Sequence, residues 1–251
     1  MESPQVLVLG CFDDLPNACV YLPPRHQQAN GRRGLKTDQK VLTTLQIPCQ
    51  VISSGLNSKR CHAQTEPKAL LAELRSALQN SDCNVVNIVK DASTNDTNVC
   101  RPSIASVQAI SDIWRQWPRM ASVLDMEPFF KTGQEIPNGE LVALIEHVLP
   151  SITILSATVG EVMALLEGAS IEAGFPTGIQ GIVAPGKKLQ SLGPRYVIVK
   201  REMFDEPEQM TALHFVLCGA GEPVVERLRC ENPKGVLGVS YSILCKASSN
   251  F

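Results

Sequence analysis

Three side chains that could bind a phosphate or a metal ion lie where predicted strands end. Asp125 is the last residue of an apolar run, Ser122–Asp125, and Thr158 and Glu161 follow a second run, Ile152–Ala157. The carboxyl ends of parallel strands meet at one edge of a sheet, where α/β proteins bind their ligands. Carboxylates at such an edge suit Mg²⁺, and a lysine among them suits a phosphate group. The sequence therefore predicts a metal or phosphate site there.

Each of these residues also has a purely structural explanation. An Asp that ends a strand often stabilises the following turn. Thr158 and Glu161 have the Thr-x-x-Glu spacing of a capping box, which by itself accounts for both. Lys200, the last residue of the apolar run Tyr196–Lys200, is either a phosphate ligand or an ordinary solvated lysine. What favours a site is that these residues follow successive predicted strands.

Other motifs and the bulk composition exclude several classes of protein. Gly181–Lys188 is similar to a phosphate-binding loop, but a lysine stands where the motif needs Ser or Thr, and the segment has a helical pattern. The nine cysteines form no Cys-x-x-Cys pair, which argues against a zinc site or a disulfide framework and for a reducing, cytoplasmic location. A net charge of −2 and the absence of long apolar runs predict neither a nucleic-acid nor a membrane partner.

The pattern of apolar residues predicts strands that alternate with helices. The expected strands are Val6–Gly10, Gln50–Leu56, Asn84–Val89, Ser122–Asp125, Ile152–Ala157, Tyr196–Lys200, Leu213–Leu217 and Val224–Arg229. The expected helices are Gly34–Gln46, Glu66–Asn80, Ser103–Trp114, Gly139–Val148, Gly160–Glu167 and Gln180–Leu192. This alternation indicates βαβ units and a mainly parallel sheet with helices on both faces, and the last two strands predict an antiparallel edge hairpin.

The order and spacing of the segments resemble the hydroxymethylpyrimidine/phosphomethylpyrimidine kinases, which are members of the ribokinase-like superfamily. Gly34–Leu45 is similar to the family's Gly-Ile-Gln-Ala-Asp-Leu-Lys-Thr segment, and Val123–Pro128 to its Val-Val-Asp-Pro-Val-Met strand end. Ile154–Leu166 resembles its Leu-Thr-Pro-Asn-x-x-Glu motif, and Leu192–Lys200 the segment that leads to its Val-Lys-Gly-Gly-His. The resemblance implies an α/β, ribokinase-like, three-layer αβα sandwich over residues 1–251 as a single domain.

The resemblance also implies the activity and its residues. The expected reaction is ATP-dependent phosphorylation of hydroxymethylpyrimidine or its phosphate in thiamine biosynthesis, with Mg²⁺ and ATP, in a protein that can form a homodimer. Glu161 would hold Mg²⁺ through water, and Asp13 and Asp38 would bind the pyrimidine. The nucleotide and its phosphates would be bound by Asp125, Thr158, Lys200, Gly235 and Gly238.

The departures from the family fall on the chemistry. Residues 14–33, an irregular insertion, replace the family's glycine-rich loop, and Pro233–Val239 replaces its Thr-His-Gly-Thr-Gly-Cys anion hole. The family's catalytic base falls on Val239 or Gly238, neither of which can take a proton. The chain also stops at Phe251, where the family continues. The alternatives are a working kinase, a catalytically impaired relative that binds a ligand or a partner, and a mispredicted or truncated reading frame.

Overall fold

A computed structural model describes residues 5–13, 42–44, 46–58, 61–64, 66–80, 83–88, 104–117, 121–126, 138–178, 180–205 and 210–230. The chain divides into two compact units, one made of residues 1–121 and 234–251 and the other of residues 122–233. Both units alternate strands with helices, as the sequence predicts. No helix in the described ranges combines the length and the apolar character that a membrane span needs.

The described strands of the first unit are β1 (Gln5–Asp13), β2 (Cys49–Ser58), β3 (Cys61–Gln64) and β4 (Cys83–Ile88). They lie in the order β3-β2-β1-β4, with β1 parallel to both β2 and β4. The sequence does not predict β3, because four residues without apolar alternation give no strand signal. This strand forms by pairing antiparallel with the end of β2, with Gln64 opposite Gly55.

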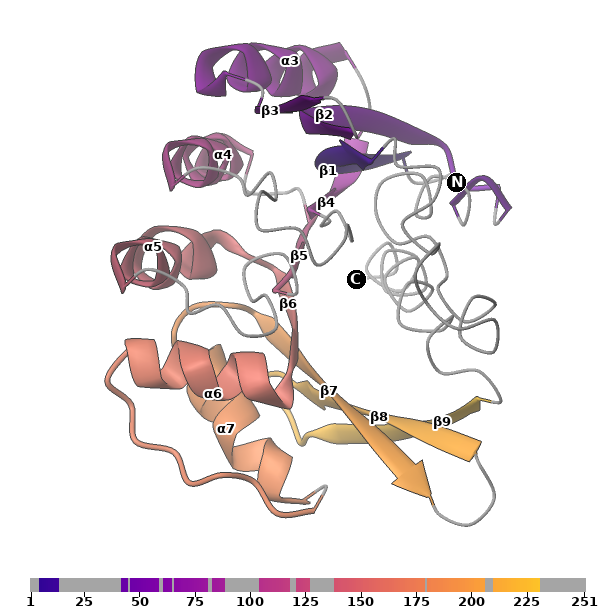
Figure 1. Cartoon of the computed structure of the whole chain (residues 1–251), viewed down its shortest axis with the longest axis vertical. Helices are drawn as coiled ribbons and strands as arrows, with labels where there is room; N and C mark the ends of the chain where they lie inside the picture. Colours follow the sequence, from indigo (N-terminus) through magenta and orange to yellow (C-terminus); the bar gives the residue numbers. More distant parts are fainter. Residues whose placement is uncertain are drawn as a thin grey trace. The chain divides into compact units, whose positions relative to one another are not determined.

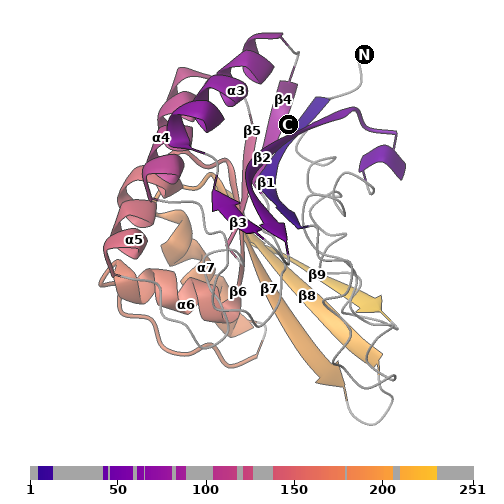
Figure 2. The ribbon, with the colours of Figure 1, turned by 45° about the horizontal axis from the view of Figure 1, so that its top comes forward.

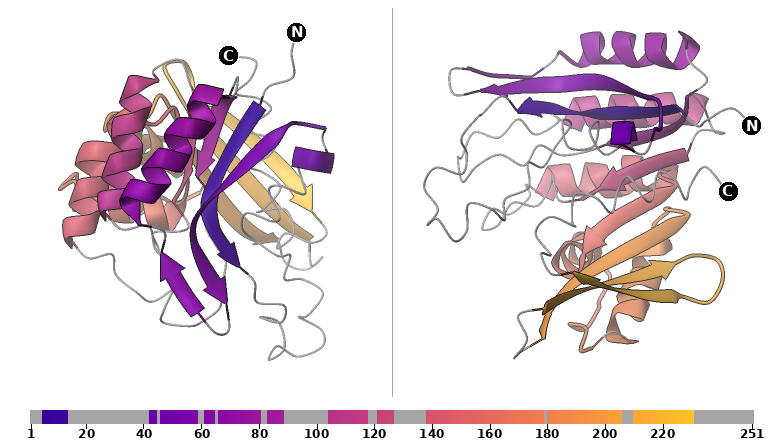
Figure 3. Two further views of the ribbon diagram at one scale, coloured as in Figure 1. Left: turned by 90° about the horizontal axis from the view of Figure 1, so that it is seen from above. Right: turned by 90° about the vertical axis from the view of Figure 1, so that its right-hand side faces the viewer.

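The first unit also contains two long helices, α3 (Pro67–Asn80) and α4 (Ile104–Gln116). They contact each other, and both lie on the same side of β1 and β2 (Figures 2 and 3). The sequence of α3 carries an apolar stripe of Leu70, Leu71, Leu74, Ala77 and Leu78, which is buried except at Leu71, where the side chain is partly exposed. Of the predicted helix 34–46, only residues 42–44 are described as helical, and residues 34–41 and 45 lie outside the described residues.

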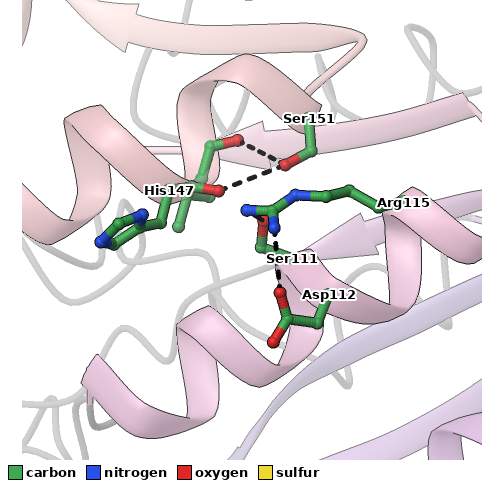
Figure 4. A network of polar contacts seen from close by, with 6 residues as sticks. Ser111, Asp112, Arg115, His147 and Ser151 are labelled. Carbon is green, nitrogen blue, oxygen red and sulfur yellow. Dashed lines mark hydrogen bonds and ion pairs between the residues drawn. The ribbon is translucent and has the colours of Figure 1, made fainter.

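The solvent side of α4 carries an ion pair within one turn. Arg115 Nη1 donates to Asp112 Oδ1 at 3.1 Å, and its Nη2 donates to Ser111 Oγ at 3.4 Å (Figure 4). Both charged side chains are exposed, so this pair contributes little to stability.

The strands of the second unit are β5 (Ala121–Asp125), which begins one residue before the unit does, β6 (Ile154–Thr158), β7 (Tyr196–Asp205), β8 (Met210–Cys218) and β9 (Val224–Cys230). They lie in the order β5-β6-β7-β8-β9, in which β5, β6 and β7 are parallel. The predicted antiparallel hairpin of β8 and β9 is confirmed, and β8 is also antiparallel to β7. Figure 3 shows β7, β8 and β9 as neighbouring strands in orange and yellow.

The helices of the second unit are α5 (Asn138–Ala143), which continues as a π-helical turn (Leu144–Val148) and a 3₁₀ turn (Leu149–Ser151), then α6 (Val159–Gly168) and α7 (Gln180–Gln190). The Ser151 hydroxyl donates to the carbonyls of His147 and Val148, at 3.3 and 3.2 Å, and so occupies carbonyls at the end of the π-helical turn (Figure 4). Because Gly181–Lys188 is part of α7, it is not a phosphate-binding loop.

α7 packs on one face of the second unit's sheet, and α6 lies beside it (Figure 1). The contact is close at Gly186, where a Cβ atom would come within 2.7 Å of Cys218 Sγ and 3.2 Å of Val199 Cγ2. Since alternate residues of a strand point to opposite faces, Ile198 and Lys200 belong to the other face of the sheet. The mixed sheet with parallel core strands confirms the predicted α/β class. A second helical layer on this other face lies outside the described residues of the unit and stays a prediction.

Candidate functional site

Strand pairing in the second unit brings three predicted site residues to one face of the sheet. Asp125 of β5 lies opposite Ser156 of β6, and Thr158 of β6 lies opposite Lys200 of β7. Ser156 and Thr158 are two residues apart on one strand, so all four side chains belong to the same face. That face is the one opposite α7. Asp125 is the last residue of β5, as the sequence predicts, and β6 ends at Thr158, one residue beyond the predicted strand.

Lys200 forms a buried ion pair with Asp125. Lys200 Nζ donates to Asp125 Oδ1 at 3.1 Å, and each side chain is only 3% exposed. Lys200 is therefore not an ordinary solvated lysine. A buried charge needs a partner, because the protein interior replaces little of the hydration that the charge loses.

Lys200 does not end its strand, and in this respect the sequence-based expectation is wrong. β7 continues to Asp205, five residues further than predicted from the apolar run. The reason is that β8 pairs with β7 along its whole length, from Val197 opposite Cys218 to Asp205 opposite Met210. The parallel ladder with β6 stops at Thr158 and Lys200, so Lys200 still marks the carboxyl edge of the parallel strands.

Thr158 and Glu161 form the predicted capping box at the start of α6. The Thr158 N–H donates to Glu161 Oε2 at 2.7 Å, and the Glu161 N–H donates to Thr158 Oγ1 at 3.4 Å. These bonds satisfy two backbone donors that a helix start otherwise leaves without partners. Glu161 is nevertheless 6% exposed, which is unusual for a carboxylate whose only task is capping.

The environment of Glu161 raises its pKa from 4.5 to about 7. Burial is the main cause, since it disfavours the charged form, and the negative charge of Asp125 adds to the effect. The Thr158 N–H and the Lys200 ammonium act in the opposite direction and lower this pKa. Glu161 thus belongs electrostatically to the same group as Asp125 and Lys200. A carboxyl group with a strongly shifted pKa, beside specific charged partners, is a recognised sign of a functional site.

The described residues could supply part of the coordination of a metal ion, with the rest coming from a bound ligand and water. They do not form a site in which protein side chains alone surround the metal. No group of three or more His, Cys, Asp or Glu side chains in the described ranges could hold a metal. Asp125 and Glu161 supply two carboxylates, which also bind Lys200 and close the capping box. Mg²⁺ is usually bound by one or two carboxylates together with waters and substrate phosphates. This donor set is therefore suited to a hydrated Mg²⁺ that arrives with a nucleotide.

The remaining predicted residues are not tested by this geometry. Asp13 is the last residue of β1, at the carboxyl end of a parallel strand in the first unit. Asp38, Gly235, Gly238 and Val239 lie outside the described residues, as does the insertion at residues 14–33.

Sequence reasoning missed two features of the site. Ser156 is fully buried and pairs with Asp125 in the strand register. It lies two residues before Thr158 on an apolar strand, and this spacing could have placed it on the same face of the sheet. The pairing of Asp125 with Lys200, 75 residues apart in the chain, was also missed. A lysine that follows four apolar residues in a core strand was the available signal for a buried partner.

Comparison with known proteins places this geometry in a fold family. No protein-family model matches the chain. The thiamine biosynthetic bifunctional enzyme TH1, chloroplastic, of Arabidopsis thaliana is 24% identical over 173 residues, which is 66% of this chain and 30% of that enzyme. The chain thus matches less than a third of the length of this curated relative.

Solved structures match almost the whole chain. Phosphomethylpyrimidine kinase from Clostridium difficile superposes with a TM-score of 0.65 at 13% identity, covering 96% of this chain and 91% of that one. The chain has the ribokinase-like fold of the vitamin kinases. Pyridoxal kinase from Bacillus subtilis, solved as an ADP complex, gives a TM-score of 0.67 at 15% identity, covering 96% of this chain and 82% of that one. Solved structures with this fold therefore include a phosphomethylpyrimidine kinase and a pyridoxal kinase, the latter as an ADP complex.

Proposed function

We propose that this chain is a vitamin-precursor kinase that transfers the γ-phosphate of ATP to hydroxymethylpyrimidine or its phosphate, with Mg²⁺ as the nucleotide's cation. The observation that carries the proposal is the buried group of Asp125, Lys200 and Glu161 at the carboxyl edge of β5, β6 and β7. In an α/β fold this edge is the expected place for a ligand. The free thiols of Cys49 and Cys218 support a reducing compartment, such as the cytoplasm.

Each residue of the site has a proposed role. Lys200 would donate to phosphate oxygens, and Glu161 would hold the Mg²⁺ of the nucleotide through water. Thr158 fixes the start of α6, and with it the position of the Glu161 carboxylate. When bound, Mg²⁺ would neutralise phosphate charge. Asp13 and Asp38 are proposed to bind the pyrimidine, and Gly235 and Gly238 to approach the transferred phosphate with their backbone N–H groups.

Transfer would be mostly a matter of positioning. The hydroxymethyl oxygen would attack the γ-phosphorus in line, and ADP would leave. Much of the rate of such a reaction comes from orientation and from stabilisation of the phosphoryl charge, while a base adds about 10²- to 10⁴-fold. Because Val239 or Gly238 stands at the family's base position, we expect slow turnover.

The same departure favours a second candidate, a ligand-binding relative without catalysis. The sequence at Pro233–Val239 lacks both the threonines and the cysteine of the family's anion hole. Such a protein would keep nucleotide binding at Lys200 and Glu161 and would release no ADP.

The test is ADP release by the purified chain with Mg-ATP and, in turn, hydroxymethylpyrimidine, its phosphate and pyridoxal. The decisive variant is Glu161→Gln, because a glutamine keeps the capping bond and removes the charge. Its matched control is Glu167→Gln, the same change at an exposed position of α6. Pyrimidine-dependent ADP release that is lost in Glu161→Gln and kept in Glu167→Gln is expected. Absence of release from folded protein that still binds Mg-ADP would establish the ligand-binding alternative.

A further inference from the structure

The Lys200 ammonium cannot fully neutralise the charge of Asp125 and bind a phosphate at the same time. It is the proposed phosphate ligand, yet its charge is already neutralised by Asp125 at 3.1 Å, inside the protein. Carboxylate and phosphate oxygens are the same kind of acceptor for an ammonium group. A phosphate that reached Lys200 would also stand beside the negative charge of Asp125, and like charges repel strongly where water is scarce.

The negative charge around Lys200 strengthens the competition between Asp125 and a phosphate. The Lys200 ammonium acts on two carboxyl groups, those of Asp125 and Glu161, and each of these is almost fully buried. A nucleotide without a cation would bring several further negative charges to this group. Asp125 would then need a different positive partner before Lys200 could turn to a phosphate.

We propose that Asp125 and the phosphates of a nucleotide compete for Lys200, so that Asp125 excludes metal-free nucleotide from the site. This inference rests on the proposed nucleotide-binding function and explains how the chain imposes a cation requirement. A divalent cation bound to the nucleotide would offer Asp125 another positive charge, and Lys200 could then turn to the phosphate. Asp125 thus disfavours the binding of metal-free nucleotide, in addition to any contact that it makes with the cation.

The inference is tested by measuring the Kd of ADP by calorimetry, once with Mg²⁺ and once with EDTA. Wild-type protein is expected to bind ADP at least about tenfold more weakly in EDTA, a difference of about 1.4 kcal/mol. Asp125→Asn is expected to tighten binding in EDTA by a similar factor. Asp112→Asn, the same change at the exposed ion pair of α4, is expected to behave like the wild type.

Three results would overturn the inference. Equal affinity of the wild type with and without Mg²⁺ would show that no exclusion exists. A folded Asp125→Asn that binds ADP in EDTA no more tightly than the wild type would show that Asp125 does not compete. If neither form of ADP binds to folded wild-type protein, then the proposed nucleotide-binding function itself is wrong.

A second variant covers the case in which Asp125→Asn fails to fold, since it leaves the Lys200 charge buried without its carboxylate. The double variant Asp125→Asn with Lys200→Met removes both charges, and neutral replacement of a buried pair is often tolerated. Its affinity for ADP should be weak, and the ratio between the affinities with Mg²⁺ and with EDTA should be smaller than in the wild type, because only the contribution of Glu161 to cation binding remains. A wild-type Mg²⁺ dependence that persisted in the folded double variant would contradict the competition.

Discussion

At the scale of single residues, Glu161 combines a structural and an electrostatic role. Its carboxylate closes the capping box of α6, and its charge is coupled to Asp125 and Lys200. The capping role follows from the Thr-x-x-Glu spacing alone. The raised pKa does not, because it depends on burial and on two charges that other strands supply.

The raised pKa makes Glu161 a source of pH-dependent stability. Below about pH 4.5 the group is protonated in both the folded and the unfolded chain. As the pH rises from there to about 7, the unfolded chain loses the proton first, so the free energy of unfolding falls by up to about 3 kcal/mol. Urea unfolding at pH 5 and pH 8 measures this loss.

Glu161→Gln should remove this part of the pH dependence, because the amide does not titrate and still accepts the Thr158 N–H bond. Glu167→Gln, on the exposed side of the same helix, should keep the wild-type loss. An equal fall in stability between pH 5 and pH 8 in wild type and Glu161→Gln would contradict the raised pKa.

At the scale of elements, the site depends on how α6 and α7 are held against the sheet. The capping box sets where α6 begins, at the end of β6. α7 approaches β7 and β8 closely at Gly186, on the face opposite Lys200. Packing on one face of β7 therefore supports the strand whose other face carries the ion pair.

Gly186→Ala should weaken this packing. The new Cβ atom would come within 2.7 Å of Cys218 Sγ and 3.2 Å of Val199 Cγ2. Overpacking of this kind costs about 1–3 kcal/mol, most of which range outweighs the gain of about 1 kcal/mol in helix propensity. We expect a net loss of stability in urea unfolding.

Gly160→Ala in α6 is the matched control, because nothing lies within 4 Å of its added Cβ atom. This variant should be as stable as the wild type or up to about 1 kcal/mol more stable. Equal stabilities of the two variants would show that α7 does not pack as closely as described.

At the scale of the whole molecule, the open question is whether two compact units unfold as one. The sequence predicts a single domain over residues 1–251, and the vitamin kinases of known structure match 96% of the chain as one fold. The two tryptophans, Trp114 and Trp117, both belong to the first unit. Their fluorescence therefore reports mainly on the surroundings of α4 in the first unit, whereas far-ultraviolet circular dichroism reports on both units.

A single domain predicts that the two signals change together. Thermal or urea unfolding followed by tryptophan fluorescence and by circular dichroism should give coincident transitions, which is the usual test of two-state behaviour. A fluorescence transition that clearly precedes or follows the other would show that residues 122–233 unfold as an independent unit. The single-domain prediction would then be wrong.

Most of the described elements could be predicted from the sequence, because long apolar patterns decide them. α3 is the clearest case, with its buried stripe of leucines and alanine. The exceptions are β3 and the second half of β7, both of which form by antiparallel pairing with a neighbour. Such pairing depends on what lies beside a segment, and the segment's own residues carry little sign of it.

By itself, the sequence determined most of the segments that become strands and helices, where α6 begins, and that Asp125 ends a parallel strand. These properties are local, since they depend on residues a few positions apart. Only the tertiary structure decided that Lys200 meets Asp125 across an intervening strand, and that Glu161 is buried beside them. Burial and charge pairing depend on strand order and register, which join residues from distant parts of the chain and change the energy of each charged group.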